Sequence, residues 1–335
     1  MKNIVRCAIV GLGRIGSMLE DDRLREKPCT HAGAVHADPD CVLVGGCDLD
    51  EARCRTFAER WNCTHVYKRV EDLLGATEPD IVCVATPPET HLHIVESVLL
   101  SNARLIICEK PLAPSGTDAM RIAHYHQAGG MKIMTNHERR YSGDYLRVRS
   151  HVESNTFGEL LSIGSRVYMG ERRSALEMLL DDGTHLVDIL RFLTGAELTG
   201  LNAELQETHG GETLFVHSTA DGTPLYMEIG AGRNHVVFEL DLSFSAGRIR
   251  IGNGLYEEYQ SAGSPFYEGM NSLMPTDARR PTRTKFFSNM LRDAVKCVLN
   301  PEAEPRSTAL DGCRSIQFID RVRELVGVRE PVHFS

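Results

Sequence analysis

The sequence predicts an α/β protein whose N-terminal, doubly wound parallel sheet is followed by an α+β domain with an open, mostly antiparallel sheet. Three observations support this prediction. A chain of 335 residues is long enough for about two domains. The first third alternates short β-branched runs with amphipathic segments, which is the pattern of βαβ units. Beyond residue 140, strand-like stretches follow one another closely and are separated by glycines or turn residues.

Five apolar runs are the predicted strands of the parallel sheet. Because they are almost continuously apolar, they fit strands that helices cover on both faces, joined by right-handed crossovers. They begin at Ile4, Val42, Ile81, Arg104 and Lys132. Helices are expected between them, for example from His91 to Leu100 and from Ser115 to Ala128.

The second domain is expected to contain strands at residues 160–169, 213–220, 224–232, 236–246 and 247–253. One helix is predicted from Leu176 to Leu193, and two more, Lys285 to Leu299 and Thr308 to Leu325, close the chain. The stretch from Ser261 to Arg283 is rich in Gly, Ser, Pro and Arg, so we expect a long loop there. The domain boundary is placed after residue 137, which assigns residues 138–335, with the closing helices at 285–325, to the second domain.

The composition narrows the class of protein. With 42% hydrophobic and 25% charged residues, the chain resembles a soluble globular protein. A formal net charge of −9 argues against a nucleic-acid partner. The first residues contain only a short apolar run before a glycine turn, which is neither a signal peptide nor a membrane-spanning segment. We therefore expect a cytoplasmic protein without a membrane partner.

The ten cysteines are scattered and contain no CxxC pair. Cys7, Cys47, Cys83 and Cys108 each lie in a predicted buried strand, where a free thiol packs as a small apolar group. We interpret them as reduced packing residues and expect no metal ion.

The segment Gly11-Leu12-Gly13-Arg14-Ile15-Gly16 follows the first predicted strand directly. In that position a GxGxxG pattern predicts a Rossmann domain, because its first two glycines allow a tight turn and a close approach of backbone to a pyrophosphate. Amide groups at the start of the next helix offset the phosphate charge. The alternative is an ordinary strand-to-helix turn.

Asp48 ends the second predicted strand. Its carboxylate can accept hydrogen bonds from both hydroxyls of an adenosine ribose and repel a 2′-phosphate, so NAD is predicted rather than NADP. Asp48 lies 32 positions after Gly16, which exceeds the usual spacing of about 20 and indicates an insertion. The insertion is predicted at Leu19 to Thr30, at the carboxyl edge of the sheet, either as a lid or substrate contact or as a surface loop without function.

The sequence resembles the glucose-fructose oxidoreductase, inositol dehydrogenase and MocA family over nearly its whole length. The resemblance rests on five motifs in the family's order: GLGRIG at 11–16, ATPPETH at 85–91, CEKPLA at 108–113, RRY at 139–141 and DDGTHLVD at 181–188. Two places depart from the family pattern: Glu138 replaces the usual asparagine before the paired arginines, and Ser174 to Glu177 replace a glycine-rich approach to the last motif.

The resemblance implies an NAD-dependent dehydrogenase that oxidises a secondary hydroxyl. It implies that Ala85, Thr86, Pro87, His91 and Glu109 lie against the cofactor and that Lys110 reaches the nicotinamide. Asp181, His185 and Asp188 are spaced to share one helix face, and the family pattern assigns catalysis to Asp181 and His185. His185 is then the expected general base, Asp181 orients it, and Lys110 stabilises the alkoxide.

The substrate is expected to be a sugar or nucleotide sugar. Candidates for lining its pocket are Arg140, Tyr141, Tyr168 and Arg173. The charged insertion and a set of arginines favour a large anionic ligand, and we predict oxidation of the 3-hydroxyl of a UDP-N-acetylhexosamine such as UDP-GlcNAc. The arginines are Arg166, Arg172, Arg173, Arg279, Arg280 and Arg283.

Two alternatives remain open at this point. One is an inositol or free-sugar dehydrogenase, and the other is a non-catalytic sensor or regulator that binds NAD. The resemblance also implies a homodimer or homotetramer.

Overall fold

The computed structural model describes residues 4–129, 131–170, 174–208, 211–279 and 284–327. The chain divides into two compact units. The first comprises Met1–Tyr141 with Lys285–Gln317, and the second comprises Ser142–Thr284 with Phe318–Ser335. The boundary therefore follows Tyr141 rather than residue 137, and the segment from Lys285, which the sequence assigned to the second domain, returns to the first unit.

In its described part, the first unit has a six-stranded parallel sheet in the order β3-β2-β1-β4-β5-β6. This confirms the predicted doubly wound sheet. The expected strands all form, and only the two-residue β3 has no counterpart in the prediction. The strands are β1 (Val5–Val10), β2 (Cys41–Cys47), β3 (Val66–Tyr67), β4 (Ile81–Val84), β5 (Leu105–Cys108) and β6 (Lys132–Thr135).

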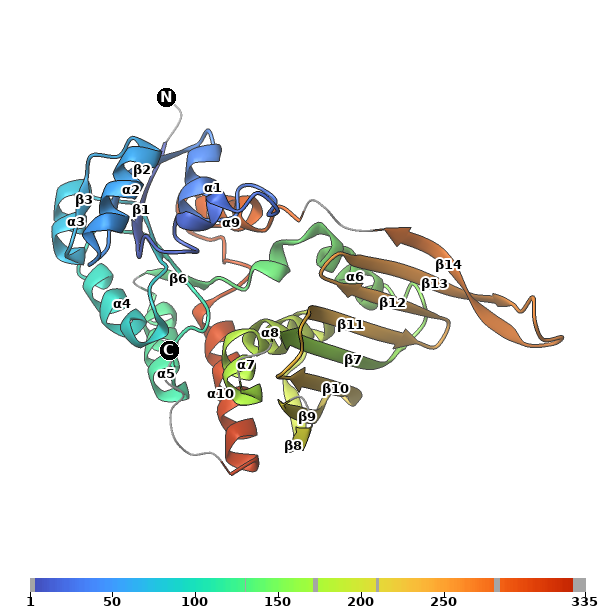
Figure 1. The fold of residues 1–335 in the computed structure, drawn as a ribbon. Helices are drawn as coiled ribbons and strands as arrows, with labels where there is room; N and C mark the ends of the chain where they lie inside the picture. Colours follow the sequence, from blue (N-terminus) through green and yellow to red (C-terminus); the bar gives the residue numbers. More distant parts are fainter. Residues whose placement is uncertain (1–3, 130, 171–173, 209–210, 280–283, 328–335) are drawn as a thin grey trace. The chain divides into compact units, whose positions relative to one another are not determined.

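Helices cover both faces of this sheet (Figure 1). Local capping explains their limits: α2, for example, begins where the Asp50 carboxylate accepts the amides of Ala52 and Arg53, and ends at Asn62 in the left-handed region. The elements are α1 (His31–Ala37), α2 (Glu51–Trp61), α3 (Val70–Thr77), α4 (His91–Leu99), α5 (Gly116–Gln127), α9 (Phe286–Leu299) and the short 3-10 helices η1 (Met18–Asp21), η2 (Pro88–Thr90) and η3 (Glu138–Tyr141).

Helix α9 explains why the chain returns to the first unit. Its buried face, which includes Phe287, Met290, Leu291 and Ala294, belongs to the same apolar cluster as residues of β1, α1 and β5. Figure 1 shows α9 beside α1. The predicted helix was therefore correct, but its assignment to the second domain differs from the structure because the amphipathic face fits the core of the parallel sheet.

The second unit has an eight-stranded sheet in its described part, in the order β14-β13-β12-β11-β7-β10-β9-β8. Neighbouring strands pair antiparallel except for β7 with β10, which confirms the predicted open, mostly antiparallel sheet. Its strands are β7 (Leu160–Met169), β8 (Leu198–Thr208), β9 (Gly211–Ala220), β10 (Thr223–Gly230), β11 (Val236–Phe244), β12 (Gly247–Gly252), β13 (Leu255–Gly263) and β14 (Asn271–Arg279). The unit also contains the helices α6 (Gly143–Glu153), α7 (Ala175–Asp181) and α8 (Gly183–Thr194). Helix α10 (Ala309–Leu325) is shared, because its residues up to Gln317 belong to the first unit and those from Phe318 to the second.

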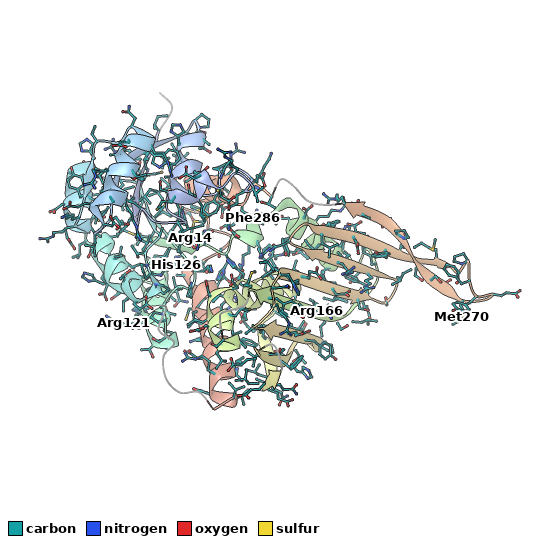
Figure 2. All side chains as sticks on the ribbon, in the orientation of Figure 1. Arg14, Arg121, His126, Arg166, Met270 and Phe286 are labelled. Carbon is teal, nitrogen blue, oxygen red and sulfur yellow. The ribbon has the colours of Figure 1, made fainter. Side chains whose placement is uncertain are left out.

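The long loop expected from Ser261 to Arg283 was wrong for its described part. β13 and β14 pair from Tyr256 opposite Arg279 to Gly263 opposite Asn271. Most side chains of β14 are exposed, so the hairpin lacks the alternation that marks a strand with one buried face. Figure 2 shows Met270 at the far end of this hairpin.

The single helix expected from Leu176 to Leu193 is divided at Asp182 into α7 and α8. The Asp182 amide still donates to the Met178 carbonyl at 2.9 Å. The Thr184 hydroxyl, however, donates to the Asp181 carbonyl at 2.8 Å, and such a bond competes with the backbone bonds of a helix.

The four strand cysteines, Cys7, Cys47, Cys83 and Cys108, are buried and form no disulfide, as predicted. None of the described helices is long and apolar enough to cross a membrane.

Candidate active site

The predicted cofactor segments meet at the carboxyl edge of the parallel sheet. Each is anchored by one backbone bond beyond a strand: Gly11 N–H donates to Cys47 O at 2.8 Å, Ala85 N–H to Val10 O at 2.7 Å, and Glu109 N–H to Val84 O at 2.9 Å. Because parallel strands end at the same edge, the loops after β1, β2, β4 and β5 lie side by side. This is where open α/β sheets bind their ligands.

The three glycines of the loop have different roles. Gly11 has φ +92°, and a Cβ there would lie 2.5 Å from the Ala85 carbonyl oxygen. A Cβ on Gly16 would overlap the Gly11 carbonyl oxygen. A Cβ on Gly13, in contrast, would meet only the Arg53 guanidinium, at 3.5 Å. The fold itself therefore requires Gly11 and Gly16, whereas Gly13 leaves open the space that a pyrophosphate needs, with Arg14 exposed and Ile15 half-buried beside it.

The insertion lies where it was predicted. His31 N–H donates to Ile15 O at 3.1 Å, and Ala32 N–H donates to Gly16 O at 3.0 Å. These bonds continue the helical turn that starts at the glycine loop as if residues 19–30 were absent. The helix predicted directly after the loop is thus interrupted by the insertion, which leaves the sheet at its carboxyl edge.

Asp48 is tied to the glycine loop. Its Oδ2 atom accepts from Leu12 N–H at 2.8 Å, its Oδ1 atom accepts from Asp50 N–H at 2.9 Å, and the side chain is 10% exposed. The Arg53 guanidinium lies 3.6 Å from Oδ2. The Asp48 carboxylate therefore orders the glycine loop, whether or not it also accepts hydrogen bonds from the hydroxyls of a ribose.

The segment after β4 divides into an open part and a buried part. Ala85 and Thr86 are half-buried and Pro87 is exposed, so these residues can face a ligand. His91 is fully buried, and its ring nitrogens lie 2.8 Å from Thr86 O and 3.1 Å from Leu112 O. Burial lowers the pKa of His91. The structure thus places His91 behind the predicted cofactor surface, where it holds two loops together.

Glu109 is the centre of a buried network beside Lys110. Its Oε1 atom is 2.8 Å from His31 Nε2 and 2.5 Å from Asn136 Nδ2, and its Oε2 atom accepts the Lys110 amide at 3.1 Å. Burial by itself would raise the pKa of Glu109, but its bonds with His31 and Asn136 lower it overall. The network fixes the backbone from which the half-buried Lys110 projects.

Sequence reasoning missed His31 and Asn136. His31 follows the insertion, and Asn136 follows β6 as Glu109 follows β5. The backbone N–H of Asn136 donates to Cys108 O at 2.7 Å. The loop after β6 therefore lies beside the loop after β5, at the same edge of the sheet. The available signal for Asn136 was a polar residue directly after a parallel strand, as Asp48 follows β2 and Glu109 follows β5.

In the second unit, Asp181, His185 and Asp188 flank the break between α7 and α8. Asp181 is half-buried at the end of α7, whereas His185 and Asp188 are buried in α8. The His185 amide donates to the Asp182 carbonyl at 3.2 Å, so the backbone stays close to helical across the break and keeps the predicted spacing. Among the described residues, no cluster of three His, Cys, Asp or Glu side chains could hold a metal ion.

Two predicted pocket residues are instead part of the core of the first unit. Tyr141 is fully buried, and its hydroxyl donates to Asp293 at 3.2 Å. Arg140 is buried, donates to Arg306 O at 2.8 Å and lies 3.1 Å from an Asp311 carboxylate oxygen. These contacts join η3 to the segment Lys285–Gln317. This segment follows the second unit in the sequence but belongs to the first compact unit, as η3 does.

Tyr168 lies on the sheet face opposite to the buried side chains of β7. Ile163 and Val167 are buried, and the alternation along a strand places Tyr168 with Arg166 on the other face. Burial, followed by the contact with Glu228, raises the pKa of Tyr168 to about 12. Arg173 lies outside the described residues.

The arginines predicted to favour an anionic ligand are engaged where they are described. Arg166 pairs with Glu228 at 3.4 Å, and Arg279 pairs with Asp144 at 2.7 Å. Arg172, Arg280 and Arg283 lie outside the described residues, like Arg173.

Known proteins are similar to this chain in sequence and in fold. Inositol 2-dehydrogenase from Corynebacterium glutamicum (strain R) is 26% identical over 212 residues, which are 62% of this chain and 59% of that protein. The chain therefore matches less than two thirds of this relative's length.

Solved structures share the fold of almost the whole chain. UDP-N-acetylglucosamine 3-dehydrogenase GnnA from Acidithiobacillus ferrooxidans has a TM-score of 0.77 at 17% identity, covering 96% of this chain and 97% of its own. An oxidoreductase from Agrobacterium radiobacter, in complex with NAD+, L-tartaric acid and magnesium, has a TM-score of 0.74 at 17% identity, covering 96% of each chain.

The family comparison identifies the first domain. Residues 5–137 match the model described as the oxidoreductase family with an NAD-binding Rossmann fold. They include the glycine loop, Asp48, Lys110 and every strand of the parallel sheet. Residues 5–137 therefore match the NAD-binding Rossmann domain of the glucose-fructose oxidoreductase, inositol dehydrogenase and MocA family.

Proposed function

We propose that the protein is an NAD-dependent dehydrogenase that oxidises a secondary hydroxyl of a cyclic polyol, with an inositol as the first candidate substrate. One observation supports this most strongly: Lys110 projects from the same sheet edge as the glycine loop, from a backbone that the buried Glu109 carboxylate holds. A cation at that place can stabilise an alkoxide while NAD, when bound, accepts the hydride.

The remaining roles follow from the chemistry of the reaction. Oxidation of the carbinol removes a hydride from its carbon, which bound NAD would accept, and a proton from its hydroxyl. We assign to His185 the role of general base, which accepts this proton at Nε2 or Nδ1, because an imidazole titrates near neutrality. We assign to Asp181 the orientation of the His185 ring. The Lys110 ammonium donates a hydrogen bond to the same oxygen and stays protonated.

The ion pairs of the described arginines favour a compact, uncharged substrate. Arg166 and Arg279 were expected to attract an anionic ligand, but their charges are already compensated by Glu228 and Asp144. The curated relatives named inositol 2-dehydrogenases agree with this choice.

UDP-N-acetylglucosamine, oxidised at its 3-hydroxyl, is the second candidate. Arg14 and Arg23 favour it, because both are exposed at the carboxyl edge of the parallel sheet, in the glycine loop and in the insertion. Their guanidinium groups could bind a diphosphate.

The experiment that tests the proposal is a substrate panel. Purified protein is mixed with NAD and, separately, with inositols, free sugars and UDP-sugars, while NADH absorbance is followed. Turnover of an inositol supports the proposal, and turnover of a UDP-sugar alone supports the second candidate. Tight NAD binding without turnover of any compound would contradict both and favour a sensor.

A further inference from the structure

Glu138 and Lys110 follow two neighbouring strands. β5 and β6 pair in parallel with Cys108 opposite Thr135, so Lys110, two residues past β5, is level with His137 and adjacent to Glu138. The two side chains are close enough for the Lys110 ammonium to lower the pKa of the Glu138 carboxyl. Any substrate held by Lys110 therefore lies close to Glu138.

The Glu138 carboxyl is an acceptor without a partner. Burial raises its pKa, as does the nearby Glu109 carboxylate, while the positive charges of Arg139, Lys110 and Arg25 act against that rise. No described residue makes a hydrogen bond to its oxygens. A carboxyl that is largely removed from water gains most from a ligand that supplies a hydroxyl donor.

Arg25, in the insertion, is near enough for its charge to act on the same carboxyl, and hydrogen bonds within the insertion hold its backbone. Lys27 Nζ donates to Leu19 O at 2.9 Å and to Asp22 O at 2.7 Å. Asp22 in turn lies 3.3 Å from the Arg25 guanidinium. The bracing limits the positions that Arg25 can take, and its charge favours the ionised form of Glu138.

We propose that Glu138 and Arg25 form a specificity subsite beside Lys110, in which Glu138 accepts a hydrogen bond from the hydroxyl on the carbon next to the one oxidised. This inference rests on the proposed function and narrows its substrate class to vicinal diols. Lys110 binds the reacting oxygen, Glu138 binds its neighbour, and Arg25 keeps Glu138 an acceptor. The insertion then contributes to substrate choice and not to cofactor binding.

The test compares a diol with its monodeoxy analogues. Whichever compound of the panel the wild type oxidises is assayed beside the analogues that lack one neighbouring hydroxyl. The wild type is expected to prefer the complete diol over one analogue by about 10- to 100-fold in kcat/KM. Glu138→Ala is expected to oxidise both at similar kcat/KM, whereas Glu138→Gln, which keeps an acceptor, retains part of the preference.

The role of the Arg25 charge is tested with its own variant and a matched control variant. Arg25→Ala is expected to reduce the preference at least about threefold, in line with a partly exposed charge contact. Arg55→Ala removes an exposed arginine of α2, outside the insertion, and is expected to leave the preference unchanged. NAD affinity, measured by fluorescence titration, checks that each variant is folded.

The outcomes separate this inference from the proposed function. A wild type that oxidises no compound of the panel overturns the proposed function, and this inference with it. A wild type that oxidises a polyol, together with Glu138→Ala and Glu138→Gln variants that bind NAD and keep the full preference, overturns this inference alone. If Glu138→Ala fails to bind NAD, the Glu138→Gln variant decides.

Discussion

His31 Nε2 lies 2.8 Å from Glu109 Oε1, with both side chains buried. Burial alone would lower the pKa of His31, but contacts with Cys83 and Glu109 raise it to about 10. The pair is therefore ionic at neutral pH, although 78 positions separate the two residues in the chain. It joins the helix that follows the insertion to the residue that precedes Lys110.

Replacing His31 with Gln is expected to lower the free energy of unfolding by about 3–5 kcal/mol at pH 7, because a buried carboxylate loses its ionic partner. The stabilisation by His31 is fully present below its unfolded pKa of about 6.5 and is lost as pH rises through about 10. The difference between wild type and variant should therefore shrink from pH 7 to pH 10. Urea unfolding at both pH values measures it, and a constant difference would contradict the ionic pair.

Lys110→Met is expected to lower kcat by about 10²- to 10³-fold, because the alkoxide loses its cationic donor. NAD affinity should change only a few-fold, since the Glu109 network and the glycine loop are unaltered. Stopped-flow hydride transfer and NAD titration separate the two effects. Turnover close to that of the wild type would rule out the assigned role of Lys110.

Gly13→Ala and Gly16→Ala should fail in different ways. A Cβ at Gly16 overlaps the Gly11 carbonyl oxygen, so this variant is expected to lose stability and solubility. A Cβ at Gly13 meets only the mobile end of Arg53, so that variant should fold but bind NAD more weakly by about tenfold or more. Thermal unfolding and NAD titration of the same samples give the comparison. Equal NAD affinity of Gly13→Ala and wild type would show that the pyrophosphate does not approach Gly13.

Asp48→Ala is expected to weaken NAD binding by about 10- to 100-fold and to reduce discrimination against NADP. The structure adds that this variant also frees the Leu12 amide, so part of the loss reflects a less ordered glycine loop. Asp50→Ala is the matched control, because the Asp50 carboxylate caps α2 and lies 3.6 Å from Arg53 without bonding to the glycine loop. Its removal should lower stability by about 1 kcal/mol without changing the cofactor ratio. Equal use of NAD and NADP by the wild type would contradict the argument.

The fold was predictable where local pattern and tertiary environment agree. The strands that begin near Ile4, Ile81 and Lys132 are mostly apolar and mostly buried, and they form close to the expected residues. β8, β13 and β14 were missed, and β8 and β14 lie at the two edges of the second sheet. An edge strand carries many exposed side chains, and β14 also contains Pro275, which only an edge position tolerates well.

The sequence motifs predicted several residues of the site, but they did not predict the hydrogen-bond network around Glu109. The glycine loop, Asp48 and Lys110 occur at positions that a sequence pattern marks. The contacts of Glu109 with His31 and Asn136 depend on the order of the strands and on a helix displaced by an insertion, and no local pattern contains them. Burial of Tyr141 likewise follows from its packing near α9, which is distant in sequence.

Deletion of residues 19–30 tests the role of the insertion directly. The bonds from His31 and Ala32 to Ile15 and Gly16 would then become ordinary bonds between residues four apart, so joining Met18 to His31 should extend one helix without strain. The shortened chain is expected to fold, to keep the His31–Glu109 pair, and to bind NAD within a few-fold of the wild type. It should lose Arg25 and, with it, part of the preference for the complete diol. Circular dichroism, NAD titration and the monodeoxy comparison measure folding, NAD affinity and diol preference. Loss of folding would show that the insertion supports the first unit rather than the substrate.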